Sequence, residues 1–296
     1  MRYQWLYGTH TYELSDSQPF EVVEIDGIDS AAVTAITEQS PLQHGNTDKG
    51  MVLQPRIIQM VIQAPNNPPT YTTEINRKLF NRIFGPSQML GRFRVTYDSG
   101  DVFEIVARCL GNSGMGRSLE KDILVRAGVA LQCPSPLWYD PVMKSIAFGI
   151  AAGSTGFTVP TPVPTFVGTS TLDQTVTLTY DGTFQEFPII HVYGPIDDMV
   201  MTNLATGRKI DLNGTLVANG DYYTFDLRFG RKFVYRNGVT TDLRTAEVTT
   251  DSQLATFAIE ADPIATDGIN PIRFTGTSVT SQTQAYMQYY DRYSGI

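Results

Sequence analysis

Cysteine, histidine and tryptophan are scarce in this 296-residue sequence, which contains two, three and two of them. Cys109 and Cys133 are too few for the disulfide framework of a small secreted domain, and neither belongs to a CxxC motif. The histidines, His10, His44 and His191, lie far apart, and none has a second metal ligand at short spacing. We therefore expect no metal site and no cofactor, and folding in a reducing cytoplasm.

Charge and long apolar runs are also limited. Charged residues make up 18% of the chain against 42% hydrophobic residues, which excludes a disordered or coiled-coil protein. The net charge of -8 would repel a phosphate backbone, so no nucleic acid binding is expected. No segment approaches the roughly 20 apolar residues of a membrane span, and the first 16 residues are too polar for a signal peptide. We expect no membrane insertion.

Signatures of catalysis are weak. No GxSxG motif marks a nucleophile, and the glycine-rich stretch 111–116 lacks the pattern of a phosphate-binding loop. Asp197 and Asp198 form the obvious carboxylate pair, but adjacent side chains on an extended strand point to opposite faces, which favours a turn. The sequence therefore predicts a protein that is not an enzyme. A glycoside hydrolase with carboxylates from distant strands is the third-ranked alternative.

The first half of the chain consists of short β-rich runs separated by turn residues. The predicted strands are Phe20–Ile25, Arg56–Gln63, Phe93–Tyr97, Val102–Cys109 and Ile123–Gln132. One helix is predicted over Glu74–Phe84, with Thr73 as its N-cap and Gly85-Pro86 as its stop. Its apolar residues Ile75, Leu79 and Ile83 are four apart, so we expect this face to pack on a sheet.

The second half is predicted to be a separate all-β domain. Residues 148–170 are rich in Gly, Pro and Thr and carry no charge, which is typical of a linker. The expected organisation is a domain over 1–146, a linker over 147–170 and a domain over 171–296. Predicted strands in the last domain are Val176–Tyr180, Phe187–Tyr193, Tyr222–Leu227, Lys232–Tyr235, Ala255–Ala261, Pro271–Thr275 and Gln284–Tyr290. Turn signals between them indicate an antiparallel sandwich or jelly roll.

Tyrosine is abundant in this second domain. Aromatic side chains on strands mostly belong to the core, yet tyrosines can also stack on a sugar ring. The residues concerned are Tyr222, Tyr223, Tyr235, Tyr286, Tyr289, Tyr290 and Tyr293. A carbohydrate-binding adhesin module that contacts the host cell surface is therefore the second-ranked function.

Several segments, taken in order, resemble the distal tail (Dit) family of siphophages over nearly the whole chain. In the first half these are Ile25–Ile28, Leu42–Gly45, Leu53–Arg56, Phe84–Pro86 and Pro136–Tyr139. In the second half they are Phe187–Ile196, Asn203–Gly207, Asp226–Lys232, Asn270–Phe274 and Tyr289–Ile296. One departure is Pro134-Ser135, where the family commonly has Asp-Pro.

The resemblance implies a fold and a structural role. It implies a mainly β protein, with an N-terminal β-sandwich or split-barrel belt domain carrying one helix and a C-terminal galectin-like antiparallel β-sandwich (jelly roll). The belt domains would close into a homo-hexameric ring that joins the tail tube protein to the tail-tip hub or fibre protein. The expected location is the virion tail tip, after assembly in the host cytoplasm. Gln43, His44 and Arg56 lie in the matched belt segment and are candidate intersubunit contacts. The alternative for them is a local network that stabilises a loop.

Overall fold

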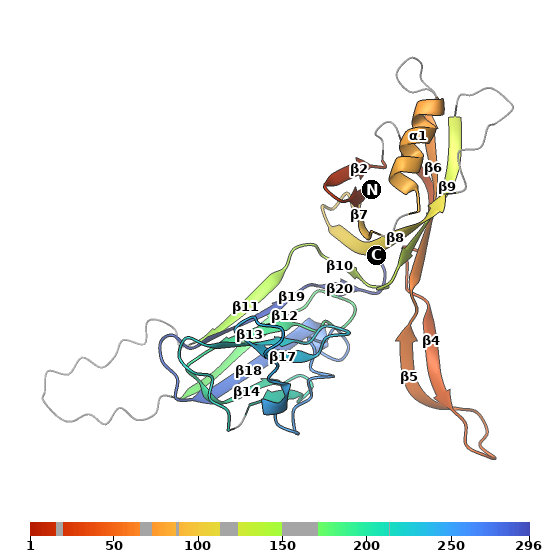
Figure 1. The fold of residues 1–296 in the computed structure, drawn as a ribbon. Coiled ribbons are helices and arrows are strands. Elements are labelled where there is room, and N and C mark those ends of the chain that lie inside the picture. Colours follow the sequence, from red (N-terminus) through yellow and green to blue (C-terminus); the bar gives the residue numbers. More distant parts are fainter. Residues whose placement is uncertain (16–19, 66–72, 87–88, 113–123, 150–170, 213) are drawn as a thin grey trace, which may run out of the picture. The chain divides into compact units, whose positions relative to one another are not determined.

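The chain forms two compact units, each described here by itself. The computed structural model describes residues 1–296 except 16–19, 66–72, 87–88, 113–123, 150–170 and 213 (Figure 1). Unit 1 comprises Met1–Pro141 together with Tyr293–Ile296, and unit 2 comprises Val142–Arg292. Both consist mainly of antiparallel strands, with a single α-helix among the described residues, which confirms the predicted fold class.

The division between the units differs in detail from the expected 1–146, 147–170 and 171–296. Strand β11 (Lys144–Gly149) pairs along its whole length with a strand of unit 2, so unit 2 begins before the expected linker. Residues 150–170 lie outside the described part of the chain. The last four residues return to unit 1, because their backbone and side chains bond and pack there.

Unit 1 is built on one large antiparallel sheet in the order β2-β1-β7-β8-β9-β6-β3. The short β10 pairs with β8 and with β20, while β4 and β5 form a separate two-stranded sheet. The strands are β1 (Arg2–Tyr7), β2 (His10–Glu13), β3 (Glu21–Asp26), β4 (Val33–Glu38), β5 (Thr47–Leu53), β6 (Arg56–Pro65), β7 (Gly91–Thr96), β8 (Val102–Asn112), β9 (Leu124–Cys133), β10 (Trp138–Tyr139) and β20 (Arg292–Tyr293).

The core of unit 1 contains side chains from strands on both sides of this sheet. Along β6, alternate residues such as Ile58 and Ile62 are buried, as the period of a half-covered strand requires. Trp5, from β1 at the other side of the sheet, belongs to the same apolar cluster as these two residues. The cluster also contains Trp138, whose indole N–H donates to the Ile28 carbonyl oxygen at 3.2 Å. Trp138 is therefore part of the core of unit 1.

The predicted helix is present as α1 (Thr73–Phe84), but a different face is buried. It ends before Gly85-Pro86, as expected. Ile83 is buried and Leu79 packs partly against the core, whereas Ile75 is 47% exposed, so the prediction for Ile75 is wrong. The fully buried residues are Asn76, Phe80 and Phe84, each one position after a predicted apolar residue, and the two large rings fill the space over the sheet.

Unit 2 is a sandwich of two antiparallel sheets. One has five strands in the order β11-β19-β13-β16-β17, and the other has four in the order β12-β18-β14-β15. Besides β11, the strands are β12 (Leu172–Thr179), β13 (Ile189–Tyr193), β14 (Asp197–Asn203), β15 (Lys209–Asp211), β16 (Tyr222–Asp226), β17 (Phe233–Arg236), β18 (Ile269–Thr277) and β19 (Gln284–Tyr289). Two short 3-10 helices span Thr245–Glu247 and Thr266–Gly268.

The sandwich core contains the inward-facing residues of both sheets. The rings of Phe148 on β11 and Phe274 on β18 are 5.8 Å apart and connect the two layers. The strand predicted over Ala255–Ala261 is wrong. Residues 257–261 are buried, but the backbone turns just before them, with the Phe257 N–H donating to the Gln253 carbonyl oxygen, and the segment forms one isolated β-bridge, between Ile259 and Glu186.

Candidate functional site

Arg56 lies at the start of β6 and is almost completely buried. Its Nε donates to the carbonyl oxygen of Pro136 at 3.0 Å, and its two terminal nitrogens donate to those of Gly27 at 2.8 Å and Ser294 at 2.5 Å. It also donates to the carbonyl oxygen of Asp29. One side chain therefore holds four backbone positions of unit 1 together.

Gly27 is required at its place in this network. Its φ of +85° lies in the left-handed region, and a Cβ there would collide with the carbonyl group of Ile57. Asp26 and Gly27 form a tight turn, in which the Gly27 N–H donates to the Asp26 carboxylate at 2.8 Å. The tight turn places the Gly27 carbonyl oxygen against Arg56.

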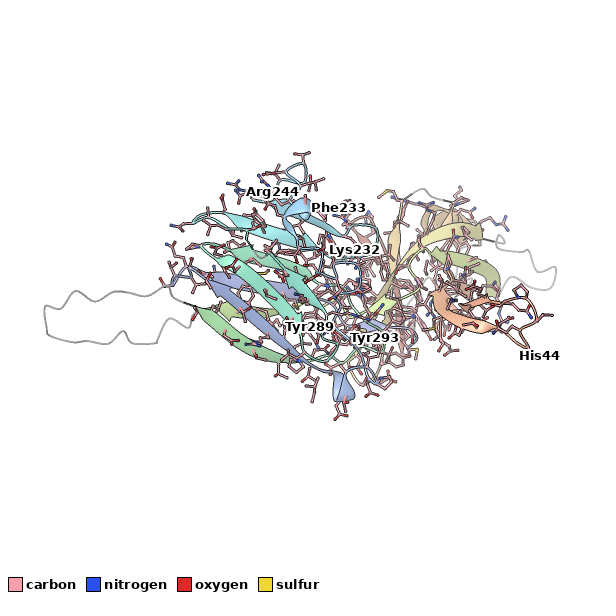
Figure 2. The ribbon with its side chains drawn as sticks, turned by 90° about the horizontal axis from the view of Figure 1, so that it is seen from below. His44, Lys232, Phe233, Arg244, Tyr289 and Tyr293 are labelled. Atoms are coloured by element: carbon pink, nitrogen blue, oxygen red, sulfur yellow. The ribbon has the colours of Figure 1, made fainter. Side chains whose placement is uncertain are left out.

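Gln43 and His44 lie at the opposite end of a hairpin from Arg56. Strands β4 and β5 pair from Val33 and Leu53 at the base to Glu38 and Thr47 at the tip. The loop beyond this last pair carries His44, which is exposed (Figure 2). The structure therefore does not bring the three candidate residues together. Their role between subunits stays a prediction.

The tip loop is closed by the side chain of Gln43. Its Oε1 accepts from the Ser40 N–H at 3.0 Å, and its Nε2 donates to Thr47 Oγ1 at 2.9 Å. Its own N–H donates to the Ser40 carbonyl oxygen at 3.0 Å. Gln43 thus stabilises the loop that presents His44.

The hairpin itself was missed by the sequence interpretation, and its surface is unusual. Both strands are exposed on both faces, including the apolar side chains of Val33, Ile36, Met51 and Val52. Its two strands pair only with each other, and in Figure 1 the hairpin continues beyond the end of β6. An isolated two-stranded hairpin is at best marginally stable in water. An exposed apolar surface of this kind is typical of a site that contacts another protein surface.

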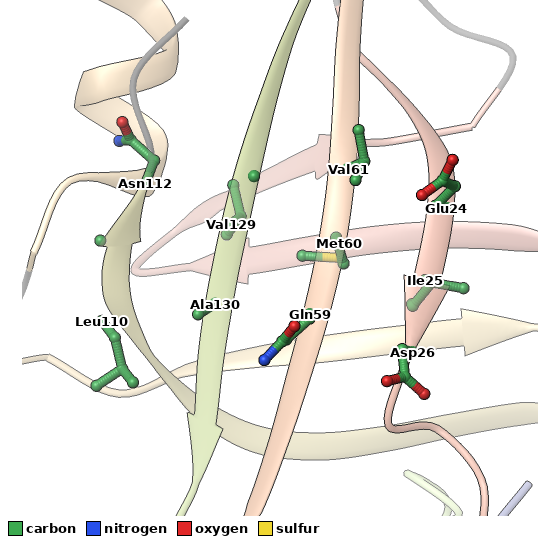
Figure 3. Close-up of a pocket in the computed structure, with 12 residues that line it drawn as sticks. Glu24, Ile25, Asp26, Gln59, Met60, Val61, Leu110, Asn112, Val129 and Ala130 are labelled. Carbon is green, nitrogen blue, oxygen red and sulfur yellow. The ribbon is translucent and has the colours of Figure 1, made fainter.

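A second surface of unit 1 is the outer face of β3, β6, β9 and β8, which forms a shallow hollow of about 620 Å³ (Figure 3). The strand register places Gln59 of β6 between Asp26 of β3 and Ala130 of β9. In the next row, Val61 lies between Glu24 and Gly128. The hollow exists because β9 contributes only small side chains at its centre.

The margins of this hollow differ in charge. The edge strand β3 carries Glu21, Glu24 and Asp26, while Arg108 of β8 and Arg126 of β9 lie on the other side. A surface that is acidic at one edge and basic at the other can meet a second copy of itself in a head-to-tail arrangement. Such an arrangement also covers the exposed backbone of an edge strand.

The aspartate pair and Cys133 occupy structural positions in the fold. Asp197 and Asp198 are the first residues of β14, so the predicted turn role of the pair is wrong; Asp198 lies at a bulge with φ +50° and accepts a hydrogen bond from the Gly214 N–H at 2.8 Å. Burial raises the pKa of Cys133 to about 12, which keeps this thiol protonated. In the described part of the chain, no cluster of three or more His, Cys, Asp or Glu side chains could hold a metal ion. Nor does any described helix have the length and apolar character needed to cross a membrane.

No protein-family model and no curated protein matches this sequence. Among solved structures, the chain is similar to the Dit protein of phage SPP1, described as a paradigm of the hub adsorption apparatus in phages that infect Gram-positive bacteria. The two share 11% sequence identity with a TM-score of 0.60, over 98% of each chain. A chain of the phage P2 baseplate, in its activated conformation with Ca, aligns over 100% of this chain and 99% of that one, with 10% identity and a TM-score of 0.48. The likeness to SPP1 Dit confirms the predicted resemblance at the level of the fold: the chain has a Dit-like fold.

Proposed function

We propose that this chain is a structural subunit of a phage tail tip, and that its first unit closes into a homo-hexameric ring. The ring would join the tail tube protein to the tail-tip hub or fibre protein in the virion, after assembly in the host cytoplasm. The Dit-like fold supports a structural rather than an enzymatic role. The number of copies is the one that the resemblance to the distal tail family implies.

The observation that carries the proposal is the exposed hairpin β4–β5. Met51 is 62% exposed and lies on one face, next to Ala35, while Ile36 and Val52 are about half exposed on the other. Burying apolar surface contributes roughly 25 cal/mol per Å², so a hairpin covered on both faces gains stability that it lacks alone. A neighbouring copy would supply this cover.

The charge pattern of the sheet face supports a closed ring over a two-fold dimer. A two-fold dimer formed by pairing the β3 edge strands of two subunits would bring their acidic side chains toward each other. A head-to-tail contact instead places the Glu24 side of one subunit near the Arg126 side of the next. Repeated around an axis, a contact of this kind produces a ring.

The test is the mass and shape of the purified full-length protein. Light scattering at micromolar concentration should give six copies of the 32.8 kDa chain, about 197 kDa, and electron micrographs should show a ring with a central hole. A protein that is monomeric at every concentration would overturn the ring proposal.

Two variants locate the contact. Ile36→Asp introduces a charge on the apolar hairpin surface and should shift rings to monomers without changing the unfolding of either unit. Thr177→Asp adds the same charge to an exposed strand position of unit 2 and should leave the rings intact. Rings that persist in the Ile36→Asp protein would remove the hairpin from the interface.

A further inference from the structure

The two outer faces of the unit 2 sandwich differ in chemistry. The outer face of the four-stranded sheet carries threonines and ion pairs, such as Thr175 and Thr177 on β12 and the pair Arg273–Asp173 at 2.6 Å. These residue types are typical of a sheet face that is simply solvated. No aromatic ring lies among the outward-facing strand residues described on this side.

The outer face of the five-stranded sheet is aromatic instead. Ile190, Val192, Ala285 and Met287 are fully buried in the sandwich core, so the residues that alternate with them point outward. Seven outward-facing residues of three adjacent strands, which we call the tyrosine face, are Gln284, Tyr286 and Gln288 of β19, His191 and Tyr193 of β13, and Tyr222 and the buried Thr224 of β16. Two further outward-facing residues, Ile189 of β13 and the buried Asp226 of β16, lie beside this face in the row of Gln288.

The strand register brings the rings of the tyrosine face together. Tyr193 pairs with Tyr222 on one side and with Gln284 on the other, and in the next row His191 lies between Thr224 and Tyr286. The rings of Tyr193 and Tyr222 are 5.0 Å apart and nearly parallel, at 26°. The Tyr286 ring meets Tyr193 edge-on, at 6.0 Å. Of the tyrosines considered from the sequence, Tyr223 and Tyr289 are buried in the core and lie outside this group.

The polar atoms of the tyrosine face are oriented, and some remain available. The His191 ring contacts Thr224 Oγ1 at 3.0 Å through Nδ1 and interacts with Gln288, and burial lowers its pKa, so it is neutral near pH 7. The Tyr286 hydroxyl donates to Gln284 at 2.6 Å. Within the described residues, the hydroxyls of Tyr193 and Tyr222 make no hydrogen bond, so both can bond to a ligand.

The charge of the face decides which ligand fits. None of its seven residues is charged at neutral pH, and the nearest carboxylate on β16, Asp226, is paired with Arg228 at 2.8 Å. The face therefore complements an uncharged molecule that combines an apolar C–H surface with many hydroxyl groups. Aromatic rings contact such C–H surfaces while their polar ends bond to the hydroxyls.

We propose that the tyrosine face binds a neutral saccharide, with Tyr193 and Tyr222 contacting the sugar ring and His191, Gln284 and Gln288 bonding to its hydroxyls. This site is independent of the ring contact proposed for unit 1. A structural subunit carrying it could hold a cell-surface glycan as well as its neighbours in the tail.

The test uses full-length protein and a panel of neutral probes: maltotriose, lactose, chitotriose and cellotriose, with sialyllactose as a charged comparison. Saturation-transfer NMR should detect binding of at least one neutral probe, and titration calorimetry then gives its Kd. Tyr193→Ala/Tyr222→Ala should weaken this binding at least tenfold, because both the ring contact and the hydroxyls are lost. The matched control Thr175→Ala/Thr177→Ala, on the other outer face, should bind as the wild type does.

A second double variant keeps the proposal testable if the alanine protein fails to fold. Tyr193→Phe/Tyr222→Phe retains the rings and removes the hydroxyls, so we expect a loss of affinity of a few fold with unchanged thermal unfolding. The proposal is overturned if no neutral probe binds at millimolar concentration, if only sialyllactose binds, or if both double variants bind as the wild type does. The mass of the assembly should be the same for every variant, which separates this result from the test of the ring.

Discussion

The guanidinium group of Arg56 donates a hydrogen bond of 2.5 Å to the carbonyl oxygen of Ser294, a residue 238 positions later in the chain. This bond attaches the C-terminal segment to unit 1, beside the backbone bond from the Ala31 N–H to the same oxygen at 3.0 Å. The segment also places the Tyr293 ring edge-on against Phe103, at 5.0 Å. Unit 1 is therefore completed by residues that follow all of unit 2 in the sequence.

Replacing Arg56 should destabilise unit 1. Arg56→Ala leaves four carbonyl oxygens without their charged donor, which we expect to cost about 3 kcal/mol of unfolding free energy. Arg56→Lys keeps the charge but cannot reach all four acceptors, so its loss should be intermediate. Denaturant unfolding monitored by tryptophan fluorescence reports on this unit, since both tryptophans lie in it.

The same variant separates the two roles considered for Arg56. If Arg56 acts within the subunit, unit 1 of the variant should unfold at a lower denaturant concentration. Assembly should then be lost only under conditions in which unit 1 unfolds. If Arg56 bonds to a neighbouring copy, light scattering should show monomers under conditions where both units remain folded. Unchanged unfolding together with unchanged assembly would contradict both roles.

Removing the last four residues should destabilise unit 1 and leave unit 2 unchanged. Ile296 packs against the core of unit 1, and its N–H donates to the Ile28 carbonyl oxygen at 3.3 Å. We expect a protein ending at Arg292 to show a lower unfolding temperature for the tryptophan-containing unit alone. Hydrogen exchange should show faster exchange at Ala31, which loses its acceptor. Equal exchange at this amide would contradict the expected result.

A pair of alanine substitutions should show which face of α1 contributes to the stability of unit 1. Phe80 is fully buried between the rings of Phe20 at 5.5 Å and Phe84 at 5.1 Å, so Phe80→Ala should cost about 3–5 kcal/mol of unfolding free energy. Ile75→Ala, on the exposed side of the same helix, should change it by less than about 0.5 kcal/mol. A large effect at Ile75 would mean that this residue is covered, for example by a neighbouring subunit.

Lys232 should make the stability of unit 2 depend on pH. Its ammonium group is 3.3 Å from the centre of the Phe187 ring, and among the described residues it has no hydrogen-bond partner. Burial lowers the pKa of Lys232 to about 8, from an ordinary value of 10.5. Between these values the unfolded chain binds more protons than the folded one, so this group makes unit 2 more stable as the pH rises from 8 to 10.5.

Lys232→Met removes this dependence and tests it. At pH 7 the folded state of the wild type buries a charged amine, so the variant should be more stable by about 1 kcal/mol after the lost contact with the Phe187 ring is subtracted. At pH 10 the difference should shrink, because the wild-type amine is then neutral in the folded state. Thermal unfolding of both proteins at pH 7 and pH 10 measures this difference in stability. A difference that does not change with pH would contradict the expected titration of Lys232.

The sequence by itself determined the strands and the helix wherever local patterns were strong. The β-rich run Arg56–Gln63 predicted β6, and the four-residue spacing in Glu74–Phe84 predicted α1. The order of the family-like segments predicted the Dit-like fold. Strands β4 and β5 were missed because a hairpin exposed on both faces carries no alternation of apolar and polar residues.

The tertiary structure alone decided which residues meet. The helix pattern allowed either neighbouring face to be buried, and the space above the sheet selected Phe80 and Phe84 over Ile75. Tyr193, Tyr222 and Tyr286 form one face only because the register aligns three strands that are distant in the sequence. Arg56 bonds to Ser294 because the chain returns to unit 1 after unit 2 is complete. Local propensity acts over a few residues, whereas register and chain return depend on the packing of the whole fold.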